Sequence, residues 1–117
     1  MRSIHFYRTS KGNCPVEEFL DSLPDKHAQK VVWTLRLVER MDRVPEQYFK
    51  KLKGTDGIWE IRTQTQGISY CILGFFVGHQ LFIVTGGFSK KQQKTPPQEI
   101  ELAIQRRNEY KRRAQTL

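Results

Sequence analysis

One arginine and a group of lysines flank the most apolar part of the sequence, and their spacing suits chemistry on a phosphate. Arg62 lies inside an apolar run, whereas Lys90, Lys91 and Lys94 follow the last such run. RNA carries its own nucleophile, the ribose 2′-OH, so a protein that cleaves it must orient the strand, neutralise growing negative charge and transfer protons. A guanidinium can hold two phosphoryl oxygens, which makes Arg62 the first candidate for a phosphate clamp.

The lysines have different candidate roles. Lys90 and Lys91 are candidate catalytic residues, as proton donors and charge stabilisers, while Lys94 is a candidate for positioning RNA. The plainer alternatives stay open, namely a surface Arg62 paired with Glu60 and a solvated lysine loop that binds phosphate without catalysis. We expect the charged face of the strand with Arg62 and the lysine cluster to form one anion-binding surface.

Four other residues are candidates for RNA contact. Glu60 should share a strand face with Arg62, where an ion pair is favoured over a general base. Tyr70 suits either the core or a base-stacking platform. Lys51 and Lys53 lie in a connector between Pro45 and Gly57 that could approach a phosphate backbone.

Residues that bind metals are scattered along the chain. The three histidines, the two cysteines and the carboxylates form no spacing typical of a metal site. We therefore expect no metal, no other cofactor and no disulfide framework. His79 falls at a predicted hairpin tip, where a turn residue is the simpler interpretation.

Three apolar runs supply the strands that must position these side chains. They cover residues 58–65, 68–77 and 80–85, and breaks of about two residues between them predict an antiparallel meander. We expect one face to carry Leu73, Phe75, Phe82 and Val84 and the other to carry Ile72, Phe76, Leu81 and Ile83. Both faces would then be apolar, so that one of them needs cover beyond the helical hairpin.

The remaining pattern predicts one strand and three helices. The strand covers residues 4–8, and a short helix begins near Pro15 and stops by Leu23. A longer helix begins at Asp25 and ends before Pro45, with its basic residues largely opposite its apolar face. These are Lys26, Lys30, Arg36, Arg40 and Arg43, which form either a solvated face or an RNA contact. A capping box at residues 95–98 predicts a last helix to about Arg113.

Length and charge limit the possible functions. A chain of 117 residues suits a single domain, and a net charge of +8 favours a polyanionic partner, above all nucleic acid or the ribosome. An anionic membrane or an acidic protein is a less favoured partner. With no signal peptide and no long apolar run, we expect a cytoplasmic protein without a membrane span.

Several of these segments together resemble a known family. They are WEIR at residues 59–62, Tyr70, GFSKKQQKTP at 87–96, the helix with Glu99, Ala103 and Tyr110, and the opening residues 6–16. The likeness covers nearly the whole chain and is to the phage Gp49-like, HigB-type branch of the RelE/ParE toxin superfamily. It implies an α+β fold, with a small antiparallel sheet of an N-terminal strand plus the meander packed on an N-terminal helical hairpin, and a C-terminal helix.

The resemblance also implies an activity and partners. The expected protein is the toxin of a type II toxin–antitoxin system that cleaves mRNA on the ribosome without a metal and leaves a 2′,3′-cyclic phosphate. A cognate antitoxin with a helix-turn-helix would neutralise it.

One departure from the family pattern keeps other functions open. Members often carry an arginine directly after the tyrosine of the second meander strand, and this chain has Cys71 there. A neutral, poorly solvated thiol cannot replace a phosphate contact. A ParE-like inhibitor of DNA gyrase that cuts nothing, and a non-catalytic RNA-binding or ribosome-associated protein, therefore remain alternatives.

Overall fold

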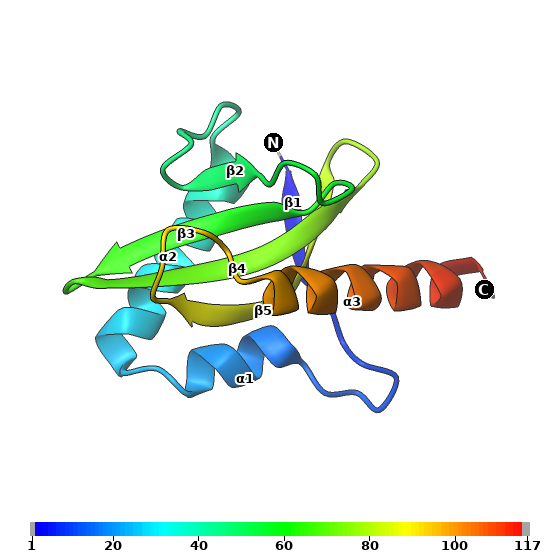
Figure 1. Ribbon diagram of the computed structural model, residues 1–117, viewed down its shortest axis with the longest axis horizontal. Helices are drawn as coiled ribbons and strands as arrows, with labels where there is room; N and C mark the ends of the chain where they lie inside the picture. Colours follow the sequence, from blue (N-terminus) through cyan, green and yellow to red (C-terminus); the bar gives the residue numbers. More distant parts are fainter. Residues whose placement is uncertain (1, 116–117) are drawn as a thin grey trace.

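The computed structural model describes residues 2–115 and has an α+β fold with one five-stranded sheet and three helices (Figure 1). The strands are β1 (Ser3–Phe6), β2 (Phe49–Lys51), β3 (Trp59–Thr65), β4 (Ile68–Val77) and β5 (Leu81–Lys90). The helices are α1 (Pro15–Asp21), α2 (Asp25–Arg40) and α3 (Pro97–Gln115). The predicted fold class is confirmed.

The sheet has the strand order β1-β5-β4-β3-β2. β3, β4 and β5 form the predicted antiparallel meander. β1 pairs with β5 in parallel, with Ser3 opposite Leu81 and Phe6 opposite Val84, so the prediction of a wholly antiparallel sheet is wrong for this strand. The long connection from β1 to β5, which includes two helices, gives the chain room for parallel pairing.

β5 is longer than predicted, because two glycines inside it conceal its continuation. It extends to Lys90 rather than to Thr85. A Cβ on Gly87 would lie 2.5 Å from the Phe19 ring, and one on Gly86 would lie 2.6 Å from the Arg106 guanidinium. The Phe19 ring therefore requires glycine at Gly87, whereas the atom closest to Gly86 is the flexible end of Arg106. Neither glycine marks the end of the strand.

β2 lies in the segment that we predicted to be a connector. It pairs antiparallel with β3 and places Lys50 opposite Glu60. A strand of three residues is too short to produce a clear alternation in the sequence. The correction matters because β2 forms the edge of the sheet next to the candidate residues.

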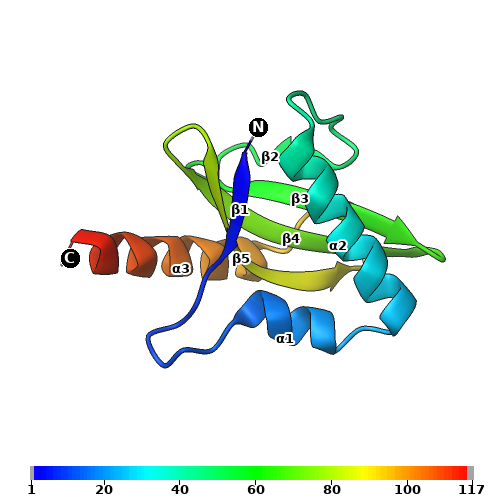
Figure 2. The ribbon, with the colours of Figure 1, turned by 180° about the vertical axis from the view of Figure 1, so that it is seen from behind.

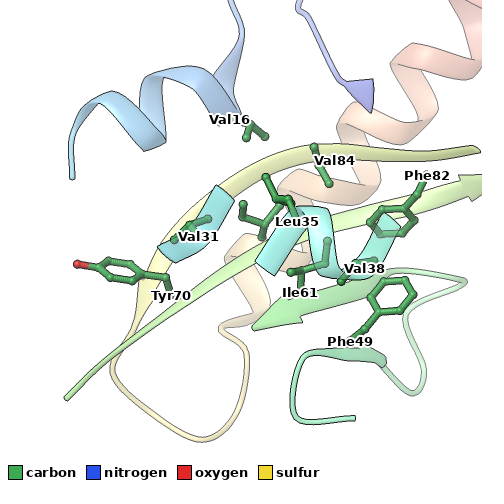
Figure 3. Close-up of a cluster of buried hydrophobic side chains, with 10 residues drawn as sticks. Val16, Val31, Leu35, Val38, Phe49, Ile61, Tyr70, Phe82 and Val84 are labelled. Atoms are coloured by element: carbon green, nitrogen blue, oxygen red, sulfur yellow. The ribbon is translucent and has the colours of Figure 1, made fainter. Parts of the chain in front are cut away.

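α1 and α2 cover one face of the sheet, as predicted for the helical hairpin (Figure 2). Figure 3 shows the cluster of buried side chains between these two helices and the sheet. It includes Val31, Leu35 and Val38 from α2 and Ile61, Ile72, Phe82 and Val84 from the sheet. Each such aliphatic or aromatic side chain contributes roughly 1.5–3 kcal/mol when it is fully buried.

α3 covers the opposite face, where Leu73, Phe75 and Ile83 pack against Ala103. The predicted face assignment was thus wrong for all four β5 residues. Phe82 and Val84 face α2, whereas Leu81 and Ile83 pack in the cluster that α3 covers. The reason is the pairing register, since Phe75 lies opposite Ile83 and paired residues share a face. Both apolar faces of the sheet are thus packed against helices of the chain itself.

α3 begins one residue later than the capping-box pattern predicts. Pro97 is its first residue, and the carbonyl of Pro96 accepts the first helical hydrogen bond, from the amide of Ile100. The Thr95 hydroxyl instead bonds a buried carboxylate, described below. Among residues 2–115, no helix is both long and apolar enough to cross a membrane.

Candidate anion-binding site

Three of the candidate residues meet on the face of the sheet that α3 covers. Glu60 and Arg62 are two residues apart in β3 and therefore point to the same side, as predicted. The pairing register places Arg62 opposite Cys71, and Lys90 ends the neighbouring strand opposite Ser69. Glu60 and Lys90, 30 positions apart in sequence, thus lie on β3 and β5 with β4 between them, and their side chains meet across β4.

Glu60 is the centre of this group and is fully buried. One of its carboxylate oxygens accepts hydrogen bonds from Arg62 Nε at 2.6 Å and from Lys90 Nζ at 3.1 Å. The other oxygen accepts a very short hydrogen bond from the Thr95 hydroxyl, which itself accepts one from Lys90 Nζ at 3.3 Å. Burial alone would raise the pKa of Glu60, but the hydrogen bonds from Arg62, Thr95 and Lys90 outweigh it and lower this pKa.

The two neighbouring lysines occupy different environments. The Lys90 side chain is 7% exposed and ion-paired with Glu60, whereas Lys91 is exposed. Neither lies at a helix N-terminus, because β5 continues through Lys90 and α3 begins only at Pro97. Lys90 therefore fixes Glu60, and Lys91 is the residue free to meet a ligand in solvent.

A hollow of about 1450 Å³ opens beside this group. Residues from α2, β2, β3, β4, β5 and the following loop line it, and that loop passes in front of β3 and β4 in Figure 1. Six of its lining residues are cations: Lys30, Lys50, Arg62, Lys90, Lys91 and Lys94. Among the described residues, no aspartate or glutamate lines it, so its wall carries a single sign of charge.

The hollow lies at the sheet edge because β2 is short. The amide of Arg62 donates to the carbonyl of Tyr48, and β3 continues beyond that contact to Thr65. Thr63 and Gln64 consequently line the hollow.

Tyr70 borders the hollow but is buried, with 5% of its surface exposed. Its hydroxyl is 2.7 Å from Nδ1 of His27, whose Nε2 is 2.7 Å from Oε1 of Gln66. Its ring meets the Phe19 ring edge-on, with 6.0 Å between centroids. These contacts favour the core role that we considered for Tyr70, and its role in RNA binding remains a prediction.

The structure separates Lys51 and Lys53 from the other candidates. Lys51 is exposed outside the hollow, and Lys53 lines a second, smaller hollow near the start of α3. Lys50 lines the main hollow instead, and our candidate residues omitted both it and Tyr48. Lys30, which we had placed on the basic helix face with RNA contact as one alternative, also lines the hollow. The signal for Lys50 was Phe49 beside it, since a buried aromatic residue in a strand directs its neighbour to the other face.

Cys71 is 1% exposed and lies opposite Arg62. Burial, and then the negative charge of Glu60, raise the pKa of its thiol to about 12. The thiol is therefore neutral near pH 7, as we expected, and adds no charge to the site. Both Cys71 and Cys14 are unpaired, buried cysteines.

The lowered pKa of Glu60 predicts a specific loss of stability in acid. The unfolded chain, in which the pKa is close to 4.5, takes up this proton first as the pH falls. The contribution of Glu60 is therefore complete above that value and is lost as the pH falls through the folded-state pKa. Urea unfolding from about pH 7 to about pH 3 measures the effect, and Glu60→Gln should show a shallower decline. Equal slopes for the two proteins would contradict this assignment.

The fold and the hollow define a small α+β protein with a cationic edge. Over residues 18–108, the chain matches the model of a family described as phage-derived Gp49-like proteins. The chain belongs to this family, which is associated with toxins of toxin–antitoxin systems. No curated protein matches the chain significantly. Among the described residues, no group of three or more histidine, cysteine, aspartate or glutamate side chains could hold a metal ion.

Proposed function

We propose that this protein is the toxin of a toxin–antitoxin system and an endoribonuclease that cuts mRNA on the ribosome. The observation that carries the proposal is the convergence of Arg62, Lys90, Lys91 and Lys94 on one hollow whose described lining has no carboxylate. Family membership supports the toxin class. The cationic wall supports a polyanionic substrate.

In the proposed reaction, the ribose 2′-oxygen attacks the adjacent phosphorus and loses its proton to a base. The bond from phosphorus to the 5′-oxygen breaks, and this leaving oxygen takes up a proton. The products are a 2′,3′-cyclic phosphate on the 5′ fragment and a 5′-OH on the 3′ fragment. Charge develops on the phosphoryl oxygens during the attack, and stabilising it is the main task of the protein.

Arg62 is the proposed phosphate clamp. Its Nε bonds Glu60, which leaves the two terminal nitrogens of the guanidinium to bond phosphoryl oxygens side by side. Its side chain is 33% exposed, so a substrate can reach it from the hollow. Glu60, held by Lys90 and Thr95, is then a positioning residue that fixes the orientation of Arg62.

The exposed lysines have a second role in the proposal. Lys91 and Lys94 lie in the loop after β5 and border the same hollow. Their ammonium groups add positive charge beside the phosphate, and we propose Lys91, the more exposed of the two adjacent lysines, as the donor of the proton to the leaving oxygen. Lys90 is mostly enclosed and acts through Glu60.

Primer extension on mRNA after brief induction tests this function. We expect discrete cuts within translated codons, with cyclic phosphates on the upstream fragments, because the attack geometry requires a 2′-OH. A matched culture that carries Arg62→Ala should show intact messages. Growth arrest with DNA damage and uncut messages would instead indicate a gyrase inhibitor. RNA binding without cuts would indicate a binding protein.

The partner is proposed on the same grounds. A toxin of this family requires an antitoxin, and we propose that a helix-turn-helix protein encoded beside it neutralises it in the cytoplasm. Co-expression of the neighbouring gene product should restore growth and copurify with the chain. If the purified chain does not bind that product, this part of the proposal is contradicted.

A further inference from the structure

The exposed side of α2 carries a basic stripe with one large aromatic residue at its centre. Lys26, Lys30, Trp33, Arg36 and Arg40 follow one another at spacings of three or four residues, which places them on one helix face. Trp33 is 45% exposed, the largest value among the exposed large hydrophobic residues of the described chain. An exposed indole among cations is unusual for a merely solvated helix face.

Trp33 is already engaged in the contacts that a nucleic-acid platform uses. The Lys30 ammonium lies over its ring, 3.9 Å from the centroid. The Tyr48 ring meets it edge-on, with the centroids 6.1 Å apart. The three side chains form a small aromatic and cationic cluster, which we call the α2 platform.

The α2 platform is continuous with the main hollow. Lys30 and Tyr48 both line the hollow, and Trp33 contacts both of them. The backbone also links the two regions, because the carbonyl oxygen of Tyr48 accepts a hydrogen bond of 2.8 Å from the amide of Arg62. A strand whose phosphate lies at Arg62 would therefore reach the α2 platform by continuing along the sheet edge.

We propose that the α2 platform is a subsite that stacks a nucleobase of single-stranded RNA flanking the phosphate held at Arg62. The Trp33 indole stacks the base, Tyr48 supports the indole from the side, and Lys30 turns to the neighbouring phosphate. The inference deepens the proposed function and rests on it for the identity of the strand. Charge favours RNA over a protein segment as the occupant, because the stripe and the hollow are both cationic.

The chain contains two tryptophans, and this makes a direct test possible. Trp59 packs against Phe49 and Phe76, so Trp59→Phe leaves Trp33 as the single fluorescent indole in a preserved core. The probe is a short single-stranded 2′-O-methyl RNA, whose blocked 2′-oxygen cannot attack. We expect it to quench Trp33 fluorescence, and an abasic version of it to bind with much less quenching.

Affinity measurements supply the second readout. Trp33→Leu should weaken binding of the same RNA at least about fivefold, whereas Trp33→Phe should keep most of the affinity. Leu102→Ala on the exposed side of α3 is the matched control and should bind as the wild type does. Circular dichroism establishes that each variant is folded.

The possible outcomes separate this inference from the proposed function. Quenching and a Trp33-dependent affinity would support the subsite even where primer extension shows no cuts, in which case the nuclease proposal alone fails. Unchanged affinity and no quenching, beside normal cleavage, would overturn the subsite alone. If Trp33→Leu no longer binds the antitoxin but keeps its affinity for RNA, the RNA subsite is also overturned. The α2 platform would then be a protein-binding surface.

Discussion

Arg62→Ala should reduce mRNA cleavage by about 10²- to 10³-fold and leave the fold intact, because it removes one preorganised stabiliser of the phosphoryl charge. Glu60 keeps its bonds to Lys90 and Thr95 in this variant, so the buried carboxylate is not left unpaired. Arg62→Lys should recover little of the loss, since an ammonium cannot bond two phosphoryl oxygens in parallel. Cleavage rates on ribosome-bound mRNA and a thermal melt measure the two effects separately.

A matched arginine provides the control for this experiment. Arg112 is exposed on α3 and lies outside the hollow, and Arg112→Ala removes the same charge from the chain. We expect it to cleave at the wild-type rate. A charge-reversed Arg62→Glu variant that still cuts transcripts would refute the role of Arg62 outright.

Glu60→Leu should cost about 3–5 kcal/mol of unfolding free energy, because it leaves the enclosed ammonium of Lys90 without a counter-charge. The double variant Glu60→Leu with Lys90→Met should recover much of that loss. Replacing both members of a buried ion pair with apolar residues of similar volume is often neutral. Urea unfolding of the four proteins in this cycle measures the coupling between the two residues.

The neighbouring lysine supplies the control here. Lys91 is exposed, and Lys91→Met should change the unfolding free energy by less than about 0.5 kcal/mol while slowing cleavage. Lys90→Met, by contrast, should destabilise the fold because the buried Glu60 then loses its enclosed cation and keeps only the more exposed Arg62. Equal stability of the two lysine variants would contradict the enclosed ion pair.

The sequence was sufficient to predict the meander and the pairing of Glu60 with Arg62. Both depend on the two-residue period of a strand, which fixes the face of each side chain once a strand is recognised. The fold class followed from the resemblance and from the same periodic segments. The grouping of Arg62 with the lysines after β5 also followed, because short hairpins return neighbouring strands to one another.

Other features depend on contacts between distant segments and could not be predicted locally. Gly86 and Gly87 ended the apolar pattern, although they continue β5 where Phe19 and Arg106 occupy the side-chain space. The enclosure of Lys90 depends on its contacts with both Thr95 and Glu60. The spacing of apolar residues along the sequence does not predict such contacts. The inclusion of Lys50 in the hollow depends on the pairing of β2 with β3.

The bonds that Glu60 accepts from Lys90 and Thr95 also set an order of assembly during synthesis. The ribosome produces the carboxylate first and its two partners some thirty residues later, as the sequence numbers show. Until the segment around Thr95 has emerged, water must solvate Glu60, and the guanidinium beside it has no fixed orientation. The orientation that Glu60 gives to Arg62 is therefore fixed only after the segment around Thr95 has been synthesised.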